Sequence, residues 1–467
     1  MLLTTYLFLL LFLGMIGHLS YLVLSDQQEM LNNSYNSRQE ILSSRNFRGT
    51  IYSHDGLVLA QTVQTAQGQD VRIYPYKNLF AHVVGYSTKG RTGVEAAANH
   101  FLIQTNIPLA DKAANDAAGR KNPGDSVYTT LDVELQQTAS DEMGIYKGAV
   151  IVTEVATGKI LSMVSQPDFD PNQIADMWED LLERKDSSIL LNRAVRGLYP
   201  PGSTFKIVTA LEYIRERPET FGNYRYECNG SYKSGDIKIS CYHGIKHGTV
   251  DLVQSFAESC NSSFANIGLN LDRKRLASTL ESLLFNRKLP IELDAAESSV
   301  LVSEDTTAAQ MIQLSIGQGK DQITPIHLHM ITSAIANGGI LQKPYVIDRV
   351  ENDVGKVTKA YQPKSYGALM SETEADILAM LMEKVVEGGT GKKLSGRGYT
   401  AAGKTGSAEF GEVKGESHSW FTGFAPVQNP QVCITVILEG AGSGGDYAVP
   451  VARRVLDAYF QKRESSR

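Results

Sequence analysis

Several features are scarce in this sequence, and each scarcity excludes a class of protein. Basic residues do not predominate: 45 Lys and Arg stand against 51 Asp and Glu, a formal net charge of −6. That balance argues against nucleic-acid binding as the main function. With 42% apolar and 21% charged residues, the composition is that of a globular chain rather than a disordered one. At 467 residues, the chain has room for two or three domains.

Charged side chains are absent altogether from the first 24 residues. The stretch "MLLTTYLFLLLFLGMIGHLSYLVL" has a single histidine, His18, and no Asp, Glu, Lys or Arg. As a helix it is long enough to cross about 30 Å of hydrocarbon. It lacks the small-x-small site of a cleaved signal peptide. We therefore predict an uncleaved transmembrane anchor over residues 1–24, although no Lys or Arg precedes the span to set its orientation.

Cysteine and metal-binding motifs are also scarce. Cys228 and Cys241 bracket a polar, turn-rich stretch, and the sequence leaves open whether a disulfide closes it. Cys260 and Cys433 have more apolar neighbours and are predicted to be inert core thiols. His247 lies in an expected loop, and neither H-E-x-x-H nor paired C-x-x-C occurs. The segment "EGGTGKKL" departs from the Walker phosphate-binding pattern and is predicted to be a flexible loop near the late strands. We predict no metal and no cofactor.

What is present indicates an α+β fold. The segment at 148–167 predicts a β-hairpin with Gly158 in its turn. Three further strands are expected near the end of the chain, at 399–410, 418–427 and 431–440, before an amphipathic helix at 448–463. Residues 170–370 are expected to be mostly helical. Early and late strands together predict one five-stranded antiparallel sheet flanked by helices.

The part between the anchor and this sheet predicts a smaller unit. Residues 25–47 are polar and are expected to form a helical stalk. "RGTIYSHDGLVLAQT" at 48–62 indicates two strands joined by an Asp55-Gly56 turn, and an alanine-rich helix is expected near residue 95. A Pro-Gly turn precedes Asp132, which is expected to cap a helix. We therefore place a membrane-proximal domain at 25–130 and a second domain at 131–467.

Three short motifs carry residue types suited to acyl-transfer chemistry. Ser203 is expected at a helix entrance with Lys206 one turn further on, the second motif pairs Ser259 with Asn261, and the third is Lys404-Thr405-Gly406 on a late strand. Each motif alone has an ordinary explanation. A serine commonly caps a helix, Ser and Asn favour turns, and glycine in a strand often marks a bulge.

Their order along the chain matches the S-x-x-K, S-x-N and K-T-G set of penicillin-binding proteins and class A β-lactamases. The sequence closely resembles the monofunctional class B penicillin-binding proteins, the peptidoglycan D,D-transpeptidases. The similar segments are "RGTIYSHDGLVLA", "GRTGVEAAAN", "LNRAVRGLYPPGSTFK", "HGTVDLVQSFAESCNSSF", "IGQGKDQITPIHL", "GKTGSAE" and "HSWFTGFAP". The resemblance implies a penicillin-binding, serine β-lactamase-like transpeptidase domain with a helical lobe. It also implies an N-terminal mixed α/β pedestal of the dimerisation type.

The same resemblance implies a role for each motif residue. Ser203 would be the nucleophile, and Lys206 would be its base if neutral; whether Lys206 is neutral or protonated is left open, with Lys404 a nearby like charge. Ser259 would relay a proton to the leaving amine. Among the substrate-binding residues, Asn261 would bind the peptide amide, and Lys404 and Thr405 would bind the terminal carboxylate. Gly406 would lie on the strand that pairs with the peptide, and the N–H of Ser407 would hold the oxyanion together with that of Ser203.

The implied substrates are peptidoglycan stem peptides ending in D-Ala-D-Ala, and β-lactams would acylate the same serine. These substrates place the catalytic domain on the extracytoplasmic side of the cell membrane. The resemblance also implies a multi-spanning glycosyltransferase partner in the membrane. Two alternatives stay open: a membrane-tethered D,D-carboxypeptidase or β-lactamase, in which water attacks the acyl-enzyme, and a non-enzymatic scaffold for wall synthesis.

Overall fold

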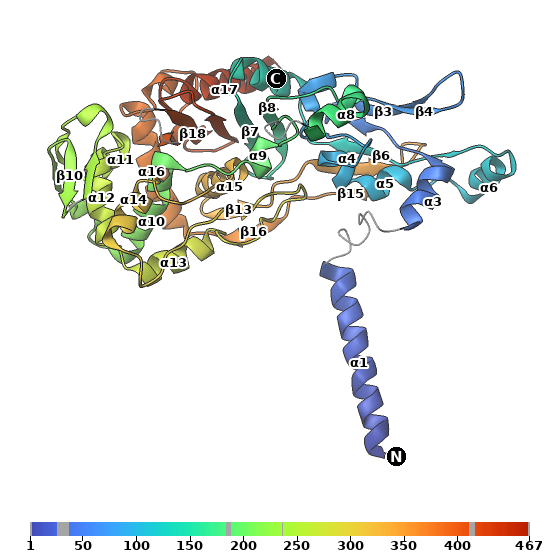
Figure 1. Cartoon of the computed structure of the whole chain (residues 1–467), viewed down its shortest axis with the longest axis horizontal. Helices are drawn as coiled ribbons and strands as arrows, with labels where there is room; N and C mark the ends of the chain where they lie inside the picture. The colour runs from blue at the N-terminus through green and yellow to red at the C-terminus, as the bar shows by residue number, and fades with distance from the viewer. Residues whose placement is uncertain (1, 26–36, 184–187, 236, 411–415, 466–467) are drawn as a thin grey trace.

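The computed structural model describes residues 2–25, 37–183, 188–235, 237–410 and 416–465 (Figure 1). The N-terminal segment forms one helix, α1 (Leu2–Ser25), whose apolar part Leu2–Tyr21 is long enough to cross a membrane and is not buried against the protein. Of the predicted stalk, residues 26–36 lie outside the described residues. The part that is described forms helix α3 (Ser37–Arg45) and strand β1 (Asn46–Phe47).

The predicted five-stranded antiparallel sheet is present in the larger part of the molecule. Its strands run in the order β17-β18-β19-β7-β8, so that two early strands complete a sheet begun by three late ones. Their bounds are β7 (Gly148–Glu154), β8 (Ile160–Gln166), β17 (Ala402–Glu409), β18 (Ser417–Ala425) and β19 (Val432–Leu438). The ends of each strand differ from the predicted ends by a few residues at most. The prediction succeeded because these strands are continuous apolar runs, the pattern of a sheet that is covered on both faces.

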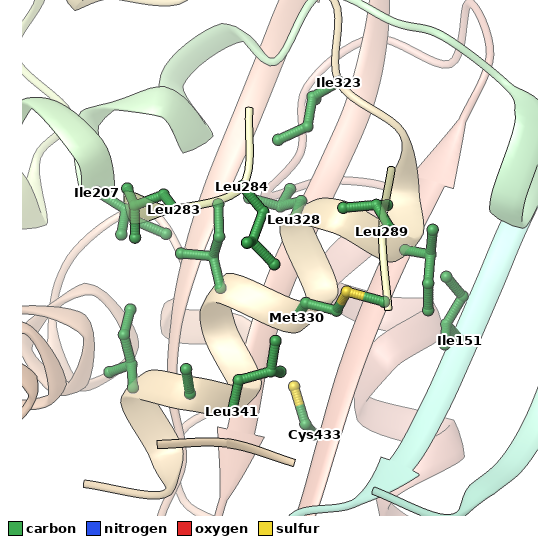
Figure 2. Packing of buried hydrophobic residues seen from close by; sticks show 14 of the residues in the cluster. Ile151, Ile207, Leu283, Leu284, Leu289, Ile323, Leu328, Met330, Leu341 and Cys433 are labelled. Atoms are coloured by element: carbon green, nitrogen blue, oxygen red, sulfur yellow. The ribbon is translucent and has the colours of Figure 1, made fainter. Parts of the chain in front are cut away.

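Helices cover both faces of this sheet. Helices α7 (Val133–Met143) and α17 (Ala448–Ser465) pack on one face, where Val150 and Val152 of β7 point. Helix α15 (Pro325–Ala336) lies on the other face (Figure 2), with Met330 near Ile151 of β7 and Cys433 of β19. Cys433 is therefore a buried core thiol, as predicted. Asp132 caps α7 by accepting a hydrogen bond from the N–H of Leu135, also as predicted.

A helical lobe is attached beside β17. Its helices are α10 (Lys206–Glu216), α11 (Leu252–Ala257), α12 (Asn261–Leu269), α13 (Arg273–Ser282), α14 (Ala308–Ser315) and α16 (Glu372–Glu387). The expectation that 170–370 is mostly helical was incomplete. That range also holds short strands, namely β9 (Tyr226–Cys228), β10 (Ser231–Ser234), β11 (Ile237–Ser240), β12 (Gly248–Val250), β13 (Ile340–Gln342), β14 (Ile347–Glu351), β15 (Val357–Ala360) and β16 (Ser365–Ala368). Such strands are too short to give a clear alternation of apolar residues.

The N-terminal unit is built on a six-stranded sheet in the order β15-β14-β6-β2-β3-β4. The strands from this part of the chain are β2 (Ile51–Tyr52), β3 (Val58–Gln64), β4 (Asp70–Ile73) and β6 (Ser126–Thr129). Strands β2 and β3 form the predicted hairpin, whereas the alanine-rich segment divides into two short helices, α4 (Gly93–Ala97) and α5 (Asn99–Ile103). Strand β14 pairs with β6, so a segment after residue 340 completes this sheet across the predicted boundary at residue 130.

Candidate active site

Ser203 lies on a tight turn that leads into α10. A 3₁₀ turn, η3 (Gly202–Phe205), comes first, and the α-helix begins at Lys206. The turn is fixed at its start because the Gly202 N–H donates to the carbonyl of Gly317 at 2.9 Å, and the Thr204 hydroxyl donates to the carbonyl of Pro201 at 2.7 Å. Ser203 is thereby held half-buried, one turn before a fully buried lysine.

Lys206 makes three hydrogen bonds to the second motif. Its Nζ donates to the carbonyl oxygen of Ser259 at 2.7 Å, to Oγ of the same residue at 3.1 Å, and to Oδ1 of Asn261 at 2.7 Å. Ser259 occupies a left-handed backbone conformation with φ of 53°, between α11 and α12. This bend presents both its carbonyl and its hydroxyl to one amine, and three oxygen acceptors match the three donors of an ammonium group.

Lys404 reaches the same hydroxyl from the sheet. Its Nζ donates to Ser259 Oγ at 3.0 Å and to the carbonyl of Thr405 at 3.1 Å. The Ser259 hydroxyl oxygen therefore lies between two amines, one from the lobe and one from β17. Both lysine side chains are completely buried. Three motifs that are far apart in the sequence are joined through one oxygen atom.

Burial lowers the pKa of both Lys206 and Lys404. Removal from water lowers the pKa of Lys206 to about 7, and the electrostatic influence of the nearby Cys260 and Cys241 opposes part of that shift. Burial, and then the like charge of Lys206, lower the pKa of Lys404 well below its usual range. Because the two amines share one acceptor and repel each other when both are protonated, the pair favours fewer than two charges at neutral pH. One of the two amines can then accept a proton.

The Ser203 turn packs against the third motif at Gly406. A Cβ at Gly406 would lie 3.0 Å from Cγ2 of Thr204 and 3.2 Å from the carbonyl oxygen of Pro201. A side chain at this position would therefore have to move β17 or the turn by a few tenths of an ångström, and glycine avoids that displacement. Strand β17 is also an edge of the five-stranded sheet. The nucleophile candidate thus lies against the strand that has an unpaired edge.

Sequence reasoning missed several residues that support this arrangement. One is Thr390, whose hydroxyl oxygen lies 2.6 Å from that of Thr405; its segment "EGGTGKKL" was predicted near the late strands, but this contact was not. Glu439 Oε1 accepts from Nε of Arg193 at 2.6 Å and from the Tyr199 hydroxyl at 2.8 Å. Arg193 and Tyr199 stand in the segment before Ser203, but nothing in that segment indicates a partner at residue 439.

The Ser203 hydroxyl makes no hydrogen bond to Lys206 in the described part of the chain, where the lysine is engaged by Ser259 and Asn261. Hydrogen bonds of catalytic groups are often long or misaligned before a substrate binds. The turn from Ser203 to Lys206 is short, so the two groups remain on one side of the site.

A second group, of three cysteines and one histidine, adjoins this site through Cys260, which stands between Ser259 and Asn261. Cys228, Cys241, His247 and Cys260 have their Sγ and imidazole nitrogen atoms all within 4.8 Å of one another, and we call them the thiol–imidazole cluster. Cys260 was predicted to be an inert core thiol: it is buried, but it packs against two other cysteines rather than against apolar side chains alone. Cys228 and Cys241 are not joined by a disulfide, since their sulfur atoms are 3.6 Å apart.

Comparison with known proteins identifies the larger domain. The family model for the penicillin binding protein transpeptidase domain matches residues 148–457, and the model for the penicillin binding protein A dimerisation domain matches residues 48–127. The chain belongs to the penicillin-binding protein transpeptidase family. The first match alone extends over more than half of the chain.

Relatives and solved structures of this family agree over most of the chain. The peptidoglycan D,D-transpeptidase PbpA of Mycolicibacterium smegmatis is 31% identical over 438 residues, which cover 87% of this chain and 88% of that protein. A transpeptidase domain from Eggerthella lenta superposes with a TM-score of 0.81 at 30% identity, covering 90% of this chain and 99% of that one. Penicillin-binding protein A from M. tuberculosis, in a ceftriaxone acyl-enzyme complex, superposes with a TM-score of 0.82 at 29% identity, covering 89% and 99%.

Proposed function

We propose that this penicillin-binding protein is a membrane-anchored peptidoglycan D,D-transpeptidase that acts through an acyl-enzyme on Ser203. One observation carries the proposal: Lys206, Ser259, Asn261 and Lys404 form one hydrogen-bonded group beside the turn that holds Ser203. Family membership and relatives named as D,D-transpeptidases support the activity. Acyl-enzyme complexes of a 29% identical structure support acylation by β-lactams.

The first step is attack of Ser203 Oγ on the carbonyl between the two terminal D-alanines. Lys206 in its neutral form takes the hydroxyl proton, which its lowered pKa of about 7 permits near neutral pH. The carbonyl oxygen becomes an oxyanion held by the backbone N–H groups of Ser203 and Ser407. The proton then passes through the Ser259 hydroxyl, which both lysines contact, to the leaving amine of D-alanine. An amine of a neighbouring stem peptide next attacks the acyl-serine and restores the free hydroxyl.

The substrate enters along the edge of β17. An extended peptide adds to an open sheet edge through main-chain hydrogen bonds, and the free side of β17 provides such an edge beside Gly406. Lys404 and Thr405 bind the terminal carboxylate, and Asn261 binds the peptide amide. Thr390 supports this pocket through its contact with Thr405.

The N-terminal part fits a pedestal that connects the anchor to the catalytic domain. We keep the division at residue 130, with residues 1–24 as anchor and 25–130 as pedestal, and add β14 and β15 to the pedestal sheet. Since the substrate is extracytoplasmic, α1 spans the membrane with the catalytic domain outside. Pedestal and anchor are the surfaces we assign to a multi-spanning glycosyltransferase partner.

Product analysis separates this function from its two rivals. The purified full-length chain is incubated with a stem pentapeptide and an added acceptor amine, and the products are identified by mass spectrometry. We expect release of D-alanine together with the acceptor-linked peptide. Hydrolysed tetrapeptide alone would indicate a carboxypeptidase, rapid turnover of penicillin would indicate a β-lactamase, and no reaction with either would indicate a scaffold.

A further inference from the structure

The thiol–imidazole cluster is assembled from four separate segments of the helical lobe. Cys228 ends β9, Cys241 follows β11, His247 precedes β12, and Cys260 is the residue before α12. In Figure 1 the labels of β10, α11 and α12 lie together at the end of the molecule far from the pedestal. Antiparallel pairing of β9 with β12 sets Cys228 opposite Gly248, so that it meets His247. The backbone of Cys241 is fixed by its N–H, which donates to the carbonyl of Gly230 at 2.9 Å.

The distances within the cluster fit the corners of a tetrahedron. Sγ of Cys228 lies 3.6 Å from Sγ of Cys241 and 3.3 Å from Nδ1 of His247, and the Sγ atoms of Cys241 and Cys260 are 3.8 Å apart. With zinc–sulfur bonds of about 2.3 Å, two sulfur atoms at tetrahedral corners are separated by about 3.8 Å. A disulfide would need a sulfur–sulfur distance of about 2.05 Å, and it would use only two of the four groups.

The surroundings of the sulfur atoms suit thiolates. All three cysteines are buried, and they form a small cluster of their own, apart from the main hydrophobic cores. The N–H of Ser263 donates to Sγ of Cys260 at 3.5 Å, and the Ser262 hydroxyl lies 3.0 Å from Sγ of Cys241. Such donors to sulfur are typical of the shell around metal-bound thiolates.

We propose that the thiol–imidazole cluster is a structural zinc site, with Cys228, Cys241, Cys260 and His247 as its four ligands. Three sulfur donors and one imidazole nitrogen are a donor set that selects zinc, and four protein ligands leave no open position for catalysis. Binding of Zn²⁺ releases the three thiol protons to solvent, which leaves the site with one net negative charge. The site goes beyond the transpeptidase activity and does not depend on it.

This zinc site holds the second motif in place. Cys260 stands between Ser259 and Asn261, and Nδ2 of Asn261 donates to the carbonyl of Ser240, the residue before Cys241, at 3.1 Å. The metal therefore fixes the chain on both sides of the Asn261 side chain, whose Oδ1 accepts from Lys206. Cys241 and Cys260 are positioning residues for the lysine group rather than catalytic residues.

Metal analysis of the full-length chain tests the site. The protein is purified in detergent in the presence of zinc, dialysed and measured by inductively coupled plasma mass spectrometry. We expect one zinc per chain, loss of this zinc in His247→Ala, and retention in His243→Ala, an exposed histidine in the same segment. His247→Cys, which restores a fourth soft ligand, retains it. Cobalt substitution is expected to give the thiolate charge-transfer and visible bands of a tetrahedral site.

A second measurement needs no variant. Chelation of zinc from the wild-type chain is expected to lower the melting temperature, and Zn²⁺ but not Mg²⁺ restores it. The fraction of chains that a fluorescent penicillin labels is expected to follow the zinc-loaded fraction. The two proposals can fail separately. If the wild-type chain binds zinc and His247→Ala does not, but fluorescent penicillin labels neither, the transpeptidase proposal fails and the zinc site stands.

Two results would overturn the zinc site. One is a Cys228–Cys241 disulfide in the peptide map of the unreduced protein as purified with zinc. The other is a metal content that is the same in wild type and in His247→Ala, which would mean that any zinc is bound elsewhere.

Discussion

The lysine group of the active site and the thiol–imidazole cluster are built on the two sides of one short loop. Ser259 and Asn261 contact the amine of Lys206, whereas Cys260 between them contacts Cys241. In the lysine group, burial lowers the pKa of Lys206 and Lys404 and so favours their neutral forms. In the thiol–imidazole cluster, a bound metal cation would deprotonate the buried thiols. The comparison shows how three consecutive residues can serve chemistry on one side and rigidity on the other. Substitutions that alter the lysine group and leave the thiol–imidazole cluster unchanged test this comparison.

The largest effect is expected from Lys206→Met. This change removes the base but keeps a buried side chain of similar length, and loss of a general base costs on the order of 10²–10⁴ in rate. We expect that fall in the rate of penicillin acylation, measured by stopped-flow fluorescence, with zinc content unchanged. Lys384→Met, on the exposed side of α16, is the matched control. An acylation rate equal to that of the control would remove Lys206 from the mechanism.

A smaller effect is expected from Asn261→Asp. The new carboxylate would face Lys206 Nζ, whose distance from Oδ1 is 2.7 Å, and an adjacent opposite charge favours the ammonium form. The pKa of Lys206 is expected to rise by about 1–3 units, so the pH at which acylation is half-maximal rises by the same amount. Asn266→Asp, on the same helix, is expected to leave the profile in place. An unchanged profile in Asn261→Asp would mean that another group controls the rate.

The pH profile of the wild-type chain gives a further test. Because the pKa of Lys206 is about 7, the acylation rate is expected to be level above that pH and to fall about tenfold per unit below it. The sign for stability follows from proton uptake. Between pH 7 and 10.5 the unfolded chain binds more protons at this group, so its contribution makes the free energy of unfolding rise with pH. A rate that is flat down to pH 5 would contradict a neutral Lys206 as base.

The smallest effect is expected from Gly406→Ala. The added methyl group would meet Thr204 and Pro201 and push β17 away from the Ser203 turn, at a cost of about 1–3 kcal/mol of stability. Acylation is expected to fall while zinc stays bound, since the thiol–imidazole cluster is on the other side of the loop. Gly398→Ala, where a methyl group meets nothing within 4 Å, serves as control in denaturation and labelling assays. Equal stability in the two variants would show that the contact is not tight.

The sequence predicted the parts of the molecule whose structure depends on residues that are close together in the chain. The strands of the main sheet follow from their apolar runs, the cap at Asp132 from its residue type, and the three motifs from their order. It did not predict that β14 would join the pedestal sheet, because the strand is short and its partner lies more than 200 residues away. The thiol–imidazole cluster was missed for the same reason. Its closest ligands in sequence, Cys241 and His247, are six positions apart, so the short metal-binding spacing is absent.

Intact-protein mass spectrometry with a β-lactam, followed by peptide mapping, tests the central claim most directly. The account predicts one adduct per chain, located on the peptide that contains Ser203, and none in Ser203→Ala. Loss of a catalytic serine commonly costs on the order of 10⁶ in rate, so no slow labelling is expected in that variant. An exposed serine variant, Ser303→Ala, is expected to label like the wild type. An adduct that persists in Ser203→Ala, or that maps to Ser259, would contradict the account.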